Sequence, residues 1–242
     1  MRWASPRLGA GKARGSSFSD ETPLRAELFN SDQMEQHGKR LASAHRLLPG
    51  RVPEQLLSRL ATNAGVLTRT CDQLTRAMVA RHRITPAGEW LLDNFYLVEE
   101  HIRTARRHLP KGYSRELPGL SDGASAGLPR VYDIALQTIA HGDGQLDPDS
   151  LSRFVAAYQT VTPLRLGELW AIPIMLRLAL IENLRRVASR IGAGSTDRDL
   201  AVTWADKLVK TARQDPNSLI LVIADMARSH PPMTTPFVSE LT

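Results

Sequence analysis

The sequence predicts an all-α fold, an irregular array of about seven to nine helices with no sheet. Leu, Ala and Arg are abundant and only 5% of the 242 residues are aromatic, a composition that favours helices. Apolar residues recur at helical spacing, and strand-forming residues never alternate in runs. A small polar residue also precedes proline repeatedly, at Thr22-Pro23, Thr85-Pro86, Asp147-Pro148, Thr162-Pro163, Asp215-Pro216 and Thr235-Pro236.

This dipeptide is typical of a helix start for two reasons. The side-chain oxygen of Thr or Asp accepts a hydrogen bond from a backbone N–H of the first turn, and proline fits the first helical position, where a backbone N–H has no partner within the helix. Together with the apolar spacing, it predicts helices over residues 53 to about 83, 86 to about 108, 128–140, 148 to about 160, 164–191, 197 to about 213 and 216–228. We expect the very apolar helix 164–191 to bend at Pro173 and to stop at Gly192. Thr235-Pro236 opens a further helix, which suggests that more chain normally follows.

We expect a flexible basic tail over residues 1–21. Four basic residues and no acidic residue lie within residues 1–19, which therefore carry +4 of the net charge of +6. The remaining residues are nearly balanced in charge. A nucleic-acid-binding surface would need a dense basic face with interleaved aromatic residues, so no nucleic-acid partner is expected. Residues 22–242 form the helical region, either as one unit or as two subregions that meet in the glycine-rich loop 110–127.

The hydropathy pattern argues against a membrane-spanning segment. The longest apolar stretch, Trp170–Ile181, is interrupted by Pro173 and Arg177 and is shorter than the roughly 20 residues that a membrane-spanning helix requires. The first 20 residues have no apolar core and do not form a secretory signal. These features predict a cytoplasmic location.

Residues with metal-binding or nucleophilic chemistry are scattered along the sequence. Cys71 lies within an apolar helical pattern and is expected to be a buried structural residue. Metal ligation requires clustered ligands, and the histidines show no such spacing, so they are expected at the solvated surface: His37, His45, His82, His101, His108, His141 and His230. The loops Gly9–Lys12 and His141–Gly144 do not complete a phosphate-binding or a calcium-binding motif.

Paired carboxylates could support glycosyl transfer if they faced one another across a pocket. The helical candidates are Glu89, Asp93, Glu99, Glu100, Glu168 and Glu182. Glu182 lies one turn from Arg185 and Arg186, a spacing equally typical of an ion pair. The sequence therefore predicts no catalytic, cofactor-binding or metal-binding residue, and no cofactor.

Several long segments resemble one family in the same order. They are PLRAELF (Pro23–Phe29), ITPAGEWLLDNFYLVEEHIRTARRHLPKGYSREL (Ile84–Leu117), LPRVYDIALQTIAH (Leu128–His141) and LSRFVAAYQTVTPLRLGELWAIPIMLRLALIENLRRVASRI (Leu151–Ile191). Together they resemble the N-terminal region of the bacterial cyclic β-1,2-glucan synthases, which make osmoregulated periplasmic glucans. The resemblance covers nearly everything from about residue 22 onward.

The resemblance implies a parent enzyme that is a UDP-glucose-dependent glycosyltransferase with a multi-span membrane region. This chain lacks the aspartate-rich and Gln-x-x-Arg-Trp signatures of processive glycosyltransferases, so no catalytic residue can be placed here. The chain is expected to be a cytoplasmic helical fragment at the inner face of the inner membrane, non-catalytic alone. Its expected partners are the remaining transferase and membrane regions. The alternatives are a stand-alone helical interaction module or gene remnant, and an independent enzyme.

Overall fold

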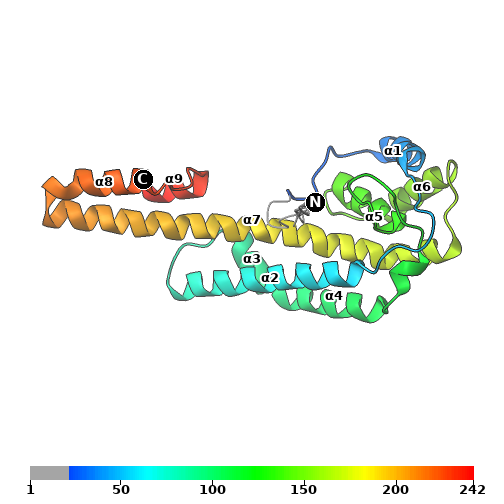
Figure 1. Ribbon diagram of the computed structural model, residues 1–242, viewed down its shortest axis with the longest axis horizontal. Coiled ribbons are helices and arrows are strands. Elements are labelled where there is room, and N and C mark those ends of the chain that lie inside the picture. Colours follow the sequence, from blue (N-terminus) through cyan, green and yellow to red (C-terminus); the bar gives the residue numbers. More distant parts are fainter. Residues whose placement is uncertain (1–21) are drawn as a thin grey trace, which may run out of the picture.

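Every regular element that the computed structural model describes, over residues 22–242, is helical (Figure 1). The α-helices are α1 (Ser31–Ala44), α2 (Leu56–Val79), α3 (Pro86–Asp93), α4 (Phe95–His108), α5 (Arg130–His141), α6 (Pro148–Gln159), α7 (Leu166–Gln214), α8 (Leu219–Arg228) and α9 (Thr235–Leu241), with 3₁₀ helices η2 (Tyr113–Glu116) and η3 (Pro216–Ser218). The all-α prediction is confirmed. The expected basic tail and the Gly9–Lys12 loop lie outside the described residues.

The long helix α7 organises the molecule. Its 49 residues span about 74 Å at the usual rise of an α-helix. Its first part lies beside α2, α4 and α5, and its last part extends beyond them with α8 and α9 folded back along it (Figure 1). Pro173 lies inside α7 and does not end it. None of the described helices combines the length and the apolar character that crossing a membrane requires.

Gly192 does not stop a helix, and the separate helices predicted over 164–191 and 197–213 are one element. Gly192 is buried against α2, where the side-chain amide of Gln73 donates to the Gly192 carbonyl at 2.8 Å and to the Thr196 hydroxyl at 2.9 Å. A side chain at position 192 would lie 3.3 Å from Gln73 and 3.5 Å from Thr70. Close packing of α2 on α7 therefore explains the glycine better than a helix end does.

The helix predicted over residues 86–108 is divided into α3 and α4 at Asn94. The Asn94 side-chain amide donates to the Trp90 carbonyl at 2.8 Å, the oxygen that also accepts from the Asn94 backbone N–H at 3.1 Å. Asparagine commonly competes with helical hydrogen bonding in this way. The break changes the direction of the chain just before α4 and was not visible in the apolar spacing.

Three of the predicted helix starts carry the expected caps. Asp147 and Thr85 accept hydrogen bonds from the backbone N–H groups of Ser150 and Gly88, and proline occupies the first turn in both helices. Asp215 caps η3 in the same way, and α9 begins within one residue of the predicted position.

The starts predicted at Thr22-Pro23 and Thr162-Pro163 are wrong. Residues 22–30 are non-helical and lie across α5 and α7, where the Leu24 N–H donates to Asn183 Oδ1 at 2.8 Å. The first helix begins only at Ser31 and was missed, although Asn30 and Gln33 form a reciprocal capping box that announces it. At the other site α7 begins at Leu166.

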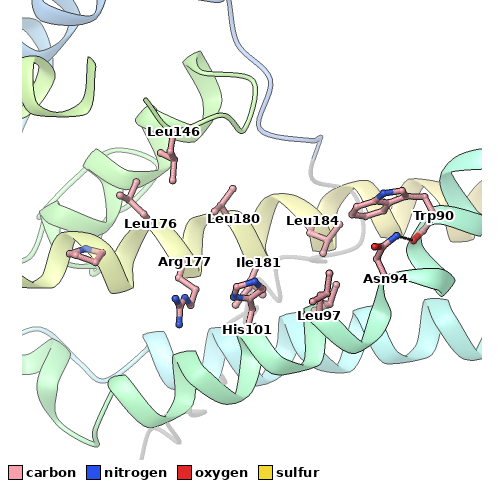
Figure 2. Close-up of a pocket in the computed structure, with 12 residues that line it drawn as sticks. Trp90, Asn94, Leu97, His101, Leu146, Leu176, Arg177, Leu180, Ile181 and Leu184 are labelled. Carbon is pink, nitrogen blue, oxygen red and sulfur yellow. Dashed lines mark hydrogen bonds between the residues drawn. The ribbon is translucent and has the colours of Figure 1, made fainter. Parts of the chain in front are cut away.

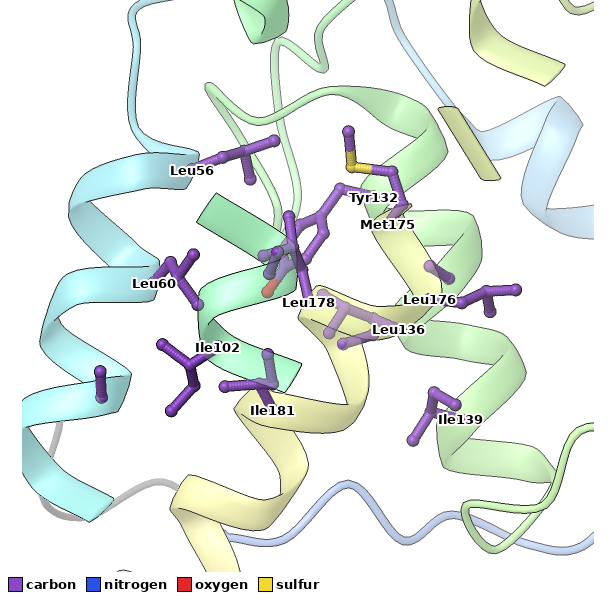
Figure 3. Packing of buried hydrophobic residues seen from close by; sticks show 14 of the residues in the cluster. Leu56, Leu60, Ile102, Tyr132, Leu136, Ile139, Met175, Leu176, Leu178 and Ile181 are labelled. Atoms are coloured by element: carbon purple, nitrogen blue, oxygen red, sulfur yellow. The ribbon is translucent and has the colours of Figure 1, made fainter. Parts of the chain in front are cut away.

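The main core joins helices from both sides of the 110–127 loop. Figure 3 shows side chains of α2, α4, α5 and α7 converging, among them Leu60, Ile102, Tyr132 and Leu178. A smaller cluster joins α1 to α6 around Phe154. The loop itself is irregular apart from η2, and a division into two subregions stays a prediction.

Gly119 allows the closest backbone approach in the loop region. It forms an isolated bridge with Pro129, and a Cβ at this position would lie 1.7 Å from a methyl carbon of Val52. We expect Gly119→Ala to lower the free energy of unfolding by about 2 kcal/mol because of overpacking, measured by urea denaturation. The matched control is Gly167→Ala in the first turn of α7, where no atom lies within 4 Å and stability should be unchanged or slightly higher. Equal stability of the two variants would contradict the packing argument.

Candidate functional site: an apolar groove between α4 and α7

An open groove of about 520 Å³ runs between α4 and α7 (Figure 2). Its lining is mostly apolar and comes from the end of α3, from α4, from α7 and from the loop before α6: Trp90, Asn94, Leu97, Val98, His101, Leu146, Pro173, Leu176, Arg177, Leu180, Ile181 and Leu184. Trp90 is 56% exposed, Leu97 40% and Leu180 36%. The volume lies within the range of protein binding sites, and no described part of the chain fills the groove.

The groove results from a second apolar row that begins on α3 and continues on α4, beside the row that packs into the core. The predicted row, represented by Val98 and Ile102, packs into the core. Trp90 and Leu97 lie seven residues apart on a neighbouring row that faces the groove. A helical segment that is apolar on more than one face needs more than one partner, so Trp90 and Leu97 are the sequence signal for the groove, which the core-facing row alone does not give.

One end of the groove is cationic. Figure 2 shows Arg177 and His101 together at this end, with Trp90 at the other. Within residues 22–242 the half-buried guanidinium of Arg177 makes no hydrogen bond or salt bridge, and no carboxylate is among the residues that line the groove. The groove therefore combines an apolar wall with a positive charge that the described residues leave uncompensated.

Glu182, on the adjacent turn of α7, is fully buried and ties α7 to α2. Its carboxylate accepts from Arg59 at 2.7 and 3.0 Å and from Asn63 at 2.8 Å, and Arg185 donates at 2.9 Å. Arg186 adds a fourth donor at 3.1 Å. Burial alone would raise the pKa of Glu182, but the hydrogen bonds and charge of Arg59, with Asn63 and Arg185, outweigh burial and lower the pKa to about 2. The ion pair predicted from the spacing is present, within a larger cluster.

Glu168 plays the corresponding part at the start of α7. It is fully buried and makes a bidentate salt bridge to Arg130 of α5 at 2.6 and 2.7 Å, and it accepts from the Arg165 N–H at 2.9 Å. Arg130 also donates to the Pro163 carbonyl at 2.8 Å. Glu168 and Glu182 are fourteen residues apart on one helix, about 21 Å, so the two buried acids do not face each other across a pocket. The other candidates, Glu89, Asp93, Glu99 and Glu100, are not buried.

Three histidines are not at the solvated surface, contrary to expectation. His45 is buried at the end of α1, where its ring nitrogens lie 2.8 Å from the Tyr158 hydroxyl and 3.1 Å from Asp133 Oδ2. His37 and His141 pack with ring centroids 4.6 Å apart, and burial lowers the pKa of His37.

These three rings join helices that are distant in sequence, so their burial could not be read from local spacing. His82 is half-buried against Asp199, while His101, His108 and His230 are exposed as predicted. Among residues 22–242, no group of three or more His, Cys, Asp or Glu side chains is arranged to hold a metal ion.

Cys71 is buried in α2, as predicted. Burial, with the charges of Asp72 and Glu99, raises the pKa of its thiol to about 11 from 9.0. The thiolate fraction at neutral pH is therefore about a hundredfold lower than for an ordinary thiol. We expect the folded chain to resist a chromogenic disulfide reagent at pH 8 and the denatured chain to react fully, which absorbance measures. Rapid complete reaction of the folded chain would contradict the burial of Cys71.

The sequence was compared with known proteins. No protein-family model matches the chain. It is 36% identical over 200 residues, or 82% of its length, to the cyclic beta-(1,2)-glucan synthase NdvB of Rhizobium meliloti. The chain spans only 7% of that protein's length. The predicted resemblance is confirmed: most of this chain is similar to one region of a cyclic β-1,2-glucan synthase.

Proposed function

We propose that this chain is the cytoplasmic helical N-terminal portion of a cyclic β-1,2-glucan synthase, at the inner face of the inner membrane. The observation that carries the proposal is the 36% identity over 82% of the chain to a protein of that name. The identity extends over 200 residues and therefore includes most of the helical body.

The proposed role is structural or regulatory for the transferase and not catalytic. Two features support this role. Glu168 and Glu182 lie on separate parts of α7, and each makes salt bridges to arginines. The two carboxylates are therefore poorly placed to act as a general acid and a general base on one substrate. The groove between α4 and α7 offers an apolar surface to another part of a larger protein. The proposed partners are the transferase and membrane regions of the synthase.

A chimeric synthase tests the proposal. The 200 matched residues of the Rhizobium meliloti protein are replaced by the corresponding residues of this chain, in cells that lack their own synthase. We expect the chimera to restore cyclic glucan, measured by chromatography of cell extracts, and a synthase lacking the region to make at least tenfold less. Both proteins are quantified in membranes so that loss of the protein is separated from loss of activity.

Full glucan production by the synthase that lacks the region would exclude an essential role. A second measurement addresses the catalytic alternative. We expect no heat when UDP-glucose is titrated into the isolated chain, and binding or hydrolysis of UDP-glucose by that chain would contradict a non-catalytic role.

A further inference from the structure

The groove between α4 and α7 has the periodicity of a helix-binding surface. On the α3–α4 side its lining residues Trp90, Asn94, Leu97 and His101 are spaced by four, three and four residues. This spacing is typical of one side of a helix, and the row is divided between α3, which holds Trp90, and α4, which holds Leu97 and His101. Although the chain is interrupted at Asn94, the row continues along the groove (Figure 2).

The opposite wall repeats the same spacing on α7. Pro173, Arg177, Leu180 and Leu184 follow one another at four, three and four residues. The two rows run in opposite directions, so that Leu184 lies near Trp90 and Arg177 near His101 (Figure 2). The α7 row lies on one continuous helix and spans about 16 Å, or three turns. Two antiparallel rows leave between them the space that the side chains of a third helix fill in helix packing.

The positive charge of Arg177 restricts which kind of segment can occupy the groove. Arg177 lies half-buried beside apolar side chains and has no partner within residues 22–242. A cation in such a setting is stabilised by an opposing carboxylate. A second copy of this chain, related by a two-fold axis, would present an identical concave groove and an identical unpaired Arg177. The groove therefore calls for a convex, acidic partner of different sequence.

We infer that the groove binds an amphipathic helix of about three turns from another region of the same synthase, with an apolar stripe against Trp90, Leu97 and Leu180 and an acidic side chain opposite Arg177. This inference rests on the proposed function. The matched relative is large enough to supply such a helix, because the present chain spans 7% of its length.

Photo-crosslinking in the chimeric synthase identifies the occupant. Leu180→benzoylphenylalanine places the reactive group in the groove, and Glu99→benzoylphenylalanine places it at an exposed position of α4 outside the groove. After illumination of membranes, we expect position 180 to form a crosslink within the same polypeptide, to a helical segment outside the matched region. Mass spectrometry locates the segment, and position 99 should not crosslink to it.

Charge reversal then tests the predicted acidic partner. Arg177→Glu in the chimera is expected to reduce both the crosslink and glucan production at least fivefold. Changing the acidic residue of the crosslinked segment to lysine should restore both. The matched control is Arg190→Glu, an exposed arginine of the same helix that does not line the groove, and it should change neither readout.

Other outcomes overturn the inference. They are a crosslink to lipid, a crosslink between two differently tagged copies at position 180, and absence of any crosslink in a chimera that makes glucan. These results are distinct from failure of the proposed function, which would appear as full glucan production without the whole region. If the lysine substitution in the crosslinked segment does not rescue Arg177→Glu, the inference that an acidic side chain of that segment pairs with Arg177 is contradicted.

Discussion

Replacing Glu182 with glutamine is expected to lower the free energy of unfolding by about 3 kcal/mol near neutral pH. The substitution keeps the shape of the side chain but removes the charge that compensates three arginines. Arg185 is fully buried and Arg59 largely so, and a buried cation without its carboxylate is costly. The difference between the folded pKa of about 2 and the ordinary value of 4.5 corresponds to a similar free energy.

Urea denaturation followed by circular dichroism measures the loss. The pH dependence provides a second test. Because the folded pKa of Glu182 lies below its unfolded value, its contribution is fully present above about pH 4.5 and disappears as the pH falls towards 2. The difference in stability between the wild-type chain and Glu182→Gln should therefore shrink with acidification. Glu99→Gln, at an exposed site, is the matched control, and a Glu182 effect no larger than this control would contradict the cluster's role.

Breaking the pair between Glu168 and Arg130 is expected to cost about as much, at the other end of the same helix. Arg130→Met leaves a fully buried carboxylate with the Arg165 N–H as its remaining partner, and we expect a loss of 3–5 kcal/mol, on the order found for broken buried pairs. Hydrogen exchange should increase at the start of α7, around residues 163–170, before it increases elsewhere.

A double substitution distinguishes the cost of the uncompensated Glu168 charge from the loss of the salt bridge itself. Adding Glu168→Leu to Arg130→Met removes the uncompensated charge and should recover part of the lost stability. The effect of Arg130→Met should add to that of Glu182→Gln, because the two clusters lie about 21 Å apart along α7. A double variant no more stable than Arg130→Met alone would contradict the account of a buried charge left without a partner.

The local features of the fold could be predicted because they depend on neighbouring residues. The caps at Thr85 and Asp147 and the core row of α4 follow from chemistry within one or two turns. Gly192 could not be assigned correctly, because its role depends on Gln73 of a helix more than a hundred residues away. Asn94 breaks a helix through one side-chain hydrogen bond that its position in the sequence does not determine.

In the candidate site, too, contacts within one helix could be predicted and contacts between helices could not. The link between Glu182 and Arg185 was visible as a one-turn spacing, while Arg59 and Asn63 reach Glu182 from α2. In the sequence, Arg177 is recognisable only as an interruption of the apolar stretch Trp170–Ile181. Among residues 22–242 Arg177 has no partner, and this could not be predicted, because an unpaired charge is a property of the packed molecule.

The uninterrupted course of α7 through Gly192 has a mechanical consequence. A helix that is clamped at Glu168 and Glu182 and extends beyond the body behaves as a stiff lever. The last 18 residues of α7, beyond the contact of Thr196 with Gln73 of α2, extend about 27 Å, so a tilt of about 10° at the body displaces the tip by roughly 5 Å. Movement of a partner bound between α4 and α7 would therefore be transmitted along α7 to a partner bound at α8, and the reverse.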